Sequence, residues 1–149
     1  AGVGYLDIIL SQLYQSNKYY LIEKDTSDNE LHFDCSSHVM REKIYPLTLL
    51  KNNLDANGIK NSSFMSPSDF KKNIDDFSNP ASLVLSFRSY CYLYDIDEYY
   101  DSLKIISDPN TYFILDVNVD RLEEFKEKFI PVEMIKAYKT FVRVLARLK

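Results

Sequence analysis

The sequence predicts a mainly α chain of α+β type: a single compact helical domain with a β-hairpin near the N-terminus. The 149 residues are 46% apolar and 27% charged, the usual mixture of one globular domain. Most apolar residues recur with the spacing of an amphipathic helix. One early stretch, Glu30–Ser36, alternates apolar and polar residues as strands do. Because Ala1 is not methionine, we expect residues 1–149 to be one interaction domain excised from a longer protein.

The first third of the chain contains a helix and the expected hairpin. Leucine and isoleucine side chains fall on one side of a helix over Tyr5–Gln15. Lys18–Asp25 and Glu30–Ser36 then flank a polar turn rich in Asp and Asn, which predicts a β-hairpin. A second helical pattern starts after His38, passes Pro46 and closes at Gly58, a residue suited to the left-handed position after a helix.

The middle of the chain is predicted to hold a loop and three more helices. Asn61–Met65 is the loop, and Ser66 then caps a helix that starts at Pro67. Ala81–Tyr94 has a single charged residue and apolar side chains nearly all round, which is typical of a buried central helix. A further amphipathic helix is expected over Ile96–Ile106.

Three segments complete the chain. Thr111–Val117 fits either a strand or a short buried helix. Asp120 and Glu123 have the spacing of a capping box that opens a helix over Arg121–Phe129. Pro131 then begins a last helix that runs to Lys149.

This last helix is expected to carry a stripe of cations opposite an apolar face. At 100° per residue, four basic residues share one side: Lys136, Lys139, Arg143 and Arg147. Residues 131–149 hold five bases and one acid, a net charge of +4, so the other 130 residues carry −8 of the total of −4. A generally nucleic-acid-binding surface is disfavoured by this acidic body.

No cofactor or metal is expected. Glycine occurs only at positions 2, 4 and 58, which argues against a phosphate-binding glycine loop and hence against a nucleotide-binding α/β enzyme. The soft metal ligands are His32, Cys35, His38 and Cys91, and their spacing across strand and helix does not converge on one point. Both cysteines are interpreted as ordinary core thiols, and no stretch reaches the ~20 apolar residues of a membrane span.

An acidic cluster with tyrosines on either side is the second surface of interest. Asp97 and Asp101 share a helix face beside Tyr99 and Tyr100. Such a cluster is usually a solvated helix start, where the helix dipole favours negative charge. Docking of a basic partner is the functional alternative.

These observations predict a non-catalytic protein–protein interaction or scaffolding domain of a nuclear or cytoplasmic assembly, with another protein as partner and no enzyme activity. The candidate partner-binding residues are Lys136, Lys139, Arg143, Arg147, Tyr99, Tyr100, Asp97 and Asp101. The alternative is a winged-helix-like nucleic-acid-binding domain that uses the basic C-terminal helix. A third hypothesis is an enzyme with Cys35 as nucleophile and His38 as base. No catalytic residue is otherwise assigned, and the oligomeric state stays open.

Overall fold

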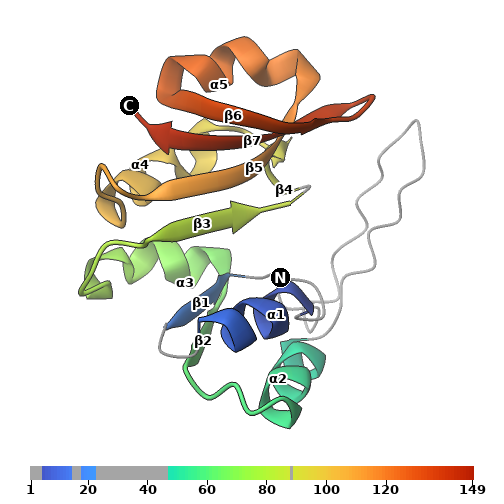
Figure 1. The fold of residues 1–149 in the computed structure, drawn as a ribbon. Helices are drawn as coiled ribbons and strands as arrows, with labels where there is room; N and C mark the ends of the chain where they lie inside the picture. Colours follow the sequence, from blue (N-terminus) through green and yellow to red (C-terminus); the bar gives the residue numbers. More distant parts are fainter. Residues whose placement is uncertain (1–4, 15–17, 23–46, 88) are drawn as a thin grey trace. The chain divides into compact units, whose positions relative to one another are not determined.

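The computed structural model describes residues 5–14, 18–22, 47–87 and 89–149 (Figure 1). The chain divides into two compact units, Ala1–Lys72 and Asn73–Lys149. Each unit is described by itself below. Within the described ranges, the helices are all too short or too polar to cross a membrane.

Unit 1 combines a parallel strand pair with helices. Its elements are α1 (Tyr5–Leu13), β1 (Tyr19–Ile22), α2 (Leu47–Ala56), β2 (Ser62–Met65) and α3 (Pro67–Lys72). The strands pair in parallel, from Tyr19 opposite Ser62 to Ile22 opposite Met65. Their small core consists of Leu21, Leu50, Leu54 and Ile59, with Ile8 and Phe64 packed against it.

The helix ends in unit 1 follow the sequence signals. Gly58 has a φ of +75° just after α2, and the Ile59 N–H donates to the Leu54 carbonyl at 3.0 Å. At the start of α3, the Asp69 N–H donates to Ser66 Oγ at 3.1 Å. The predictions of α1, of the glycine-closed α2 and of the Ser66 cap are confirmed for the described residues.

The strand pairing of unit 1 differs from the sequence prediction. β1 is a strand as expected, but its described partner is β2, which was predicted to be a loop. Ser62–Met65 has only four residues, two of them serine, so no alternation marks it as a strand. The second arm of the predicted hairpin, Glu30–Ser36, lies outside the described residues.

Unit 2 is built on a mixed sheet of four strands in the order β3-β5-β7-β6 (Figure 1). Its strands are β3 (Leu83–Ser86), β4 (Ser89–Tyr94), β5 (Tyr112–Asn118), β6 (Phe129–Ala137) and β7 (Phe141–Leu148), and its helices are η1 (Ile74–Asp76), α4 (Asp97–Ile105), η2 (Val119–Arg121) and α5 (Leu122–Lys128). β3 runs parallel to β5, whereas β7 is antiparallel to both β5 and β6. β4 lies beside β5, outside this strand order.

The core of unit 2 lies on one face of β5 and β7. The inward side chains of the two strands are Phe113, Leu115, Val117, Val142, Val144 and Ala146, all buried. Phe125 of α5 stacks on Phe129 with 4.6 Å between ring centroids, and Phe113 meets Phe129 edge-on. Full burial of one such ring stabilises the fold by roughly 1.5–3 kcal/mol. Helices α4 and α5 confirm the predictions for those segments, and Thr111–Val117 proves to be a strand.

Two of the predicted helices are wrong. Ala81–Tyr94 forms β3 and β4, because a short continuous apolar run fits a strand as well as a buried helix, and its periodicity does not separate the two. Pro131–Lys149 forms β6 and β7, an antiparallel hairpin. In β7 the buried residues alternate with the arginines, a period of two that outweighs the helical spacing of the cations.

The mainly α prediction is therefore wrong, since the chain is an α/β structure with one parallel and one mixed sheet. Strands connect to strands through helices in both units. Such connections are typical of α/β folds.

Candidate functional site

The carboxyl ends of parallel strands define the candidate site in each unit. In open α/β sheets, ligands bind outside these ends. In unit 1 the relevant residues follow Ile22 of β1 and Met65 of β2. In unit 2 they follow β3 and β5, next to the tip of the β6–β7 hairpin, because Asn118 pairs with Phe141 (Figure 1).

The sequence places two glycines before α1 and an acid after β1. Gly4 directly precedes α1 in the sequence, Gly2 stands two residues earlier, and Glu23 directly follows β1. A glycine pair before a helix allows close approach of a ligand to the backbone, and an acid about 20 residues further on is placed to bind ribose hydroxyls.

The site in unit 2 is centred on Arg143. Its Nε donates to Asp116 Oδ1 at 2.7 Å, and its Nη2 donates to Asp116 Oδ2 at 2.9 Å. Asp116 lies near the carboxyl end of β5 and is completely buried, with 0% exposure. Hydrogen bonding to this carboxylate raises the pKa of Arg143 above its ordinary value. The guanidinium therefore stays charged and is fixed in orientation.

One aromatic ring lies over this arginine, and others cluster at the hairpin tip. The guanidinium carbon of Arg143 lies 4.1 Å from the centroid of the Phe87 ring, which follows β3 and is itself exposed. At the hairpin tip, Tyr138 stacks on Phe141 with centroids 4.2 Å apart. Tyr92 of β4 meets Phe141 edge-on at 5.6 Å. The carboxyl edge of unit 2 thus presents flat apolar surfaces beside a fixed cation.

The four residues of the predicted basic stripe are placed differently from the prediction. Lys136 lies in β6, Lys139 in the hairpin turn, and Arg143 and Arg147 in β7. Arg147 lies over the Tyr112 ring and donates to the Tyr112 hydroxyl from Nη2. A helical stripe does not exist here, although Arg143 and Arg147 do share one face of a strand. Partner binding by these residues stays a prediction.

The acidic and tyrosine candidates lie on α4, next to α5. Asp97 forms an ion pair with Lys128 of α5. Tyr99 meets Tyr90 edge-on at 5.8 Å, and Tyr100 meets Phe129 at 6.1 Å. Asp101 is exposed. Three of these four side chains thus have contacts inside unit 2, and binding of a partner by them stays untested.

Of the cysteine and histidine candidates, the structure describes Cys91 alone. Cys91 is fully buried in β4, as expected of a core thiol. Burial raises the pKa of its thiol well above the ordinary value, so Cys91 is unsuited to be a nucleophile. His32, Cys35 and His38 lie outside the described residues. Among the residues that are described, no three His, Cys, Asp or Glu side chains gather as metal ligands would.

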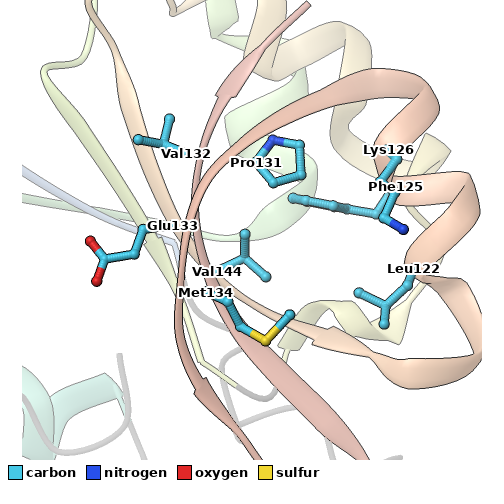
Figure 2. A pocket seen from close by; sticks show the side chains of 8 residues that line it. All are labelled: Leu122, Phe125, Lys126, Pro131, Val132, Glu133, Met134 and Val144. Carbon is cyan, nitrogen blue, oxygen red and sulfur yellow. The ribbon is translucent and has the colours of Figure 1, made fainter.

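A small apolar pocket of about 130 Å³ lies between α5 and β6. Figure 2 shows Pro131, Met134 and Val144 on the side of Phe125 and Leu122, whereas Val132 and Glu133 point away from them. It contains none of the residues at the carboxyl edge, and so it belongs to a different surface.

Comparison with known proteins identifies the fold. No family model matches the chain, and no curated protein is significantly similar to it. Among solved structures, it is similar to precorrin-6y C5,15-methyltransferase from Geobacter metallireducens GS-15, with a TM-score of 0.58 and 15% identity, over 98% of this chain and 74% of that one. It also matches a ribosomal protein L11 methylase from Lactobacillus delbrueckii subsp. bulgaricus (12% identity, TM-score 0.46, 95% of this chain and 76% of that one), from which we draw nothing.

The chain has the Rossmann-like α/β fold of methyltransferases. This finding corrects the sequence-based predictions of a non-catalytic interaction, scaffold or adaptor domain and of a chain that is no enzyme. It also overturns the winged-helix alternative, since the C-terminal residues form a hairpin of the sheet and not a DNA-reading helix.

Proposed function

We propose that this chain is a methyltransferase domain that binds S-adenosylmethionine. The observation that carries the proposal is the methyltransferase fold over 98% of the chain. The residue types at the carboxyl ends of the strands in each unit support it further.

The cofactor side is assigned to unit 1. Gly2 and Gly4 precede α1 in the sequence, and a glycine-containing segment before a helix is a residue pattern that suits the carboxylate of the methionine part. The carboxylates of Glu23 and Asp25, which follow β1 in sequence, suit the two ribose hydroxyls as hydrogen-bond acceptors. The types of residue present at these positions therefore fit the group. When bound, it supplies an electrophilic methyl group.

The acceptor side is assigned to the carboxyl edge of unit 2. Arg143 has five N–H donors, of which two are used by Asp116, so three remain for oxygen atoms of an acceptor. Phe87 and Tyr138 add exposed ring surface beside it. An acceptor with a planar part and a carboxylate, phosphate or hydroxyl-rich part fits this combination. Asp116 acts through Arg143 by holding it in place.

Direct binding of the cofactor tests the proposal. Titration of the full-length protein with S-adenosylmethionine, and separately with S-adenosylhomocysteine, is expected to saturate in a calorimeter below about 1 mM, the upper end of usual enzyme values. The effects of Glu23→Gln and Asp25→Asn on the affinity for the cofactor should together amount to about tenfold or more. The control is Glu133→Gln, a substitution of an exposed residue in β6, which should leave this affinity unchanged.

Absence of saturation with both compounds, for a protein that is folded by circular dichroism, would overturn the cofactor assignment. Equal affinity of all three variants would overturn the role of the acids. The expectation of a nuclear or cytoplasmic protein with a protein partner remains a prediction, supported only by the lack of a disulfide framework in a chain with two cysteines.

A further inference from the structure

Strand β6 is an exposed edge of the mixed sheet. It is the last strand in the order β3-β5-β7-β6, so its one described neighbour is β7. Eight of its nine residues are exposed. Four large apolar side chains are between 45% and 62% exposed: Ile130, Val132, Met134 and Ile135. An open, apolar edge of this length is a template for another strand.

The charges of β6 have no oppositely charged partner among the described residues of unit 2, although the Lys136 ammonium lies 5.0 Å from the centroid of the Tyr138 ring. Lys136 lies opposite Arg143, a like charge that is already bound to Asp116. Glu133 lies opposite Leu145. In the part of the chain that the structure describes, no ion pair is formed by Glu133 or Lys136. Like charges directly opposite each other destabilise a strand pair, so an acid beside Lys136 would be favourable.

A register shift in β6 places the side chains of Glu133 and Lys136 on one face of the sheet. Residues three apart in a regular strand point to opposite faces. Here the register shifts between Met134 and Lys136, so Glu133 pairs with Leu145 and Lys136 with Arg143, two residues that share a face of β7. Met134 pairs with Val144 on the other face, toward α5 (Figure 2). The edge thus has an acid and a base on one face.

This arrangement is complementary to itself. When two copies of β6 run antiparallel about a twofold axis between Met134 and Ile135, Glu133 of each copy lies opposite Lys136 of the other. A twofold axis perpendicular to the sheet keeps both residues on the same face, so two equivalent ion pairs form.

We propose that β6 binds a second copy of this chain through antiparallel β6–β6 pairing, with Glu133 and Lys136 joined in reciprocal ion pairs. The mixed sheets of two copies then form one continuous sheet. The exposed apolar residues of β6 become covered, and the apolar pocket beside Met134 extends this surface toward α5. The proposal is independent of the methyltransferase assignment.

Charge swaps at these two positions test the proposal. Sedimentation equilibrium of the full-length protein is expected to show a dimer. Lys136→Glu and Glu133→Lys should each weaken dimerisation at least tenfold, because each places like charges opposite each other. An equimolar mixture of the two variants should restore a mixed dimer, in which every ion pair is present with reversed or native polarity. Lys139→Glu, in the hairpin turn, is the matched control and should dimerise like the parent.

Three results would overturn the proposal. One is a parent protein that stays monomeric up to about 100 μM, well above the range of stable dimers. The second is a dimer that both single variants preserve, since another surface then forms it. The third is the loss of dimerisation in both variants without recovery in the mixture, while circular dichroism and thermal unfolding show that both are folded.

Discussion

Unit 2 contains two buried pairs of polar side chains, one of them charged and the other neutral. Asp116 and Arg143, on β5 and β7, form a charged pair with two hydrogen bonds. Tyr90 and Cys91, neighbours in β4, form a neutral pair. Burial of an isolated charge costs far more than burial of a neutral polar group, so a buried carboxylate requires a cation close by.

The neutral pair keeps its protons through burial. Burial raises the pKa of both the Tyr90 hydroxyl and the Cys91 thiol, and the Tyr90 hydroxyl donates to the Ile96 carbonyl at 2.7 Å. Tyr90 thereby ties β4 to the start of α4. The charged pair instead lies at the carboxyl end of β5, where it fixes the orientation of Arg143. The comparison indicates that the neutral pair serves stability, whereas the charged pair serves the proposed acceptor site.

The largest expected effect comes from breaking the charged pair. Asp116→Ala leaves the Arg143 guanidinium without its carboxylate and should lower the free energy of unfolding by about 3 kcal/mol, at the low end for broken buried pairs because Arg143 is partly exposed. Urea unfolding at neutral pH measures this loss. Asp101→Ala, an exposed aspartate of α4, should change stability by less than about 0.5 kcal/mol. Equal losses in both variants would show that the pair has no special role.

Alkaline pH should lower the stability of the fold because of the neutral pair. Below the ordinary thiol pKa of 9.0, Cys91 is protonated in the folded and the unfolded chain alike. Above it the unfolded chain loses the proton while the folded chain retains it, so stability falls as pH rises. The slope reaches about 1.4 kcal/mol per pH unit for one group. Tyr90 adds to this fall above its ordinary pKa of 10.0.

Urea unfolding between about pH 8 and pH 10.5, under reducing conditions, follows this decrease. The Cys91→Ala variant removes the thiol and should show a flatter profile between pH 9 and pH 10 than the parent. An identical pH profile for the two proteins would mean that Cys91 ionises as readily in the folded chain as in the unfolded one.

The sequence predicted helices better than strands, for a physical reason. α2, α3 and α5 have local signals such as Gly58, Ser66 and the acids at their starts, and local signals are readable without the fold. β3 and β7 depend on neighbours that are distant in sequence. The apolar run of β3 and the basic spacing of β7 also resemble those of helices, so periodicity alone misassigned both strands.

The candidate site was predictable only in part. Arg143 was singled out as a cation, but its partner Asp116 is 27 residues away and is brought beside it by the β5–β7 register. No sequence pattern marks such a contact. The glycine pair before α1 was visible, yet two glycines are a weak signal until a helix, a parallel strand and an acid are known to follow.

The smallest expected effect on stability comes from the backbone conformation of Cys91 in the neutral pair. Cys91 is the one described residue other than glycine with a positive φ, +65°, a conformation that costs an L-residue about 1–2 kcal/mol. Glycine bears no such cost, although within ordinary strands it is about 0.5–1 kcal/mol less favourable than alanine. Cys91→Gly should therefore be as stable as Cys91→Ala or more stable, by up to about 1 kcal/mol.

The same two substitutions at Ser89, also in β4 but without a positive φ, provide the control, and there alanine should be the more stable. Urea midpoints for the four variants give both differences under one condition. Because the two variants at each position differ by a single methyl group, the loss of the sulfur cancels from the comparison at Cys91. A Cys91→Ala protein that is clearly more stable than Cys91→Gly would show that packing of Cβ, and not backbone strain, determines the stability difference at this position of β4.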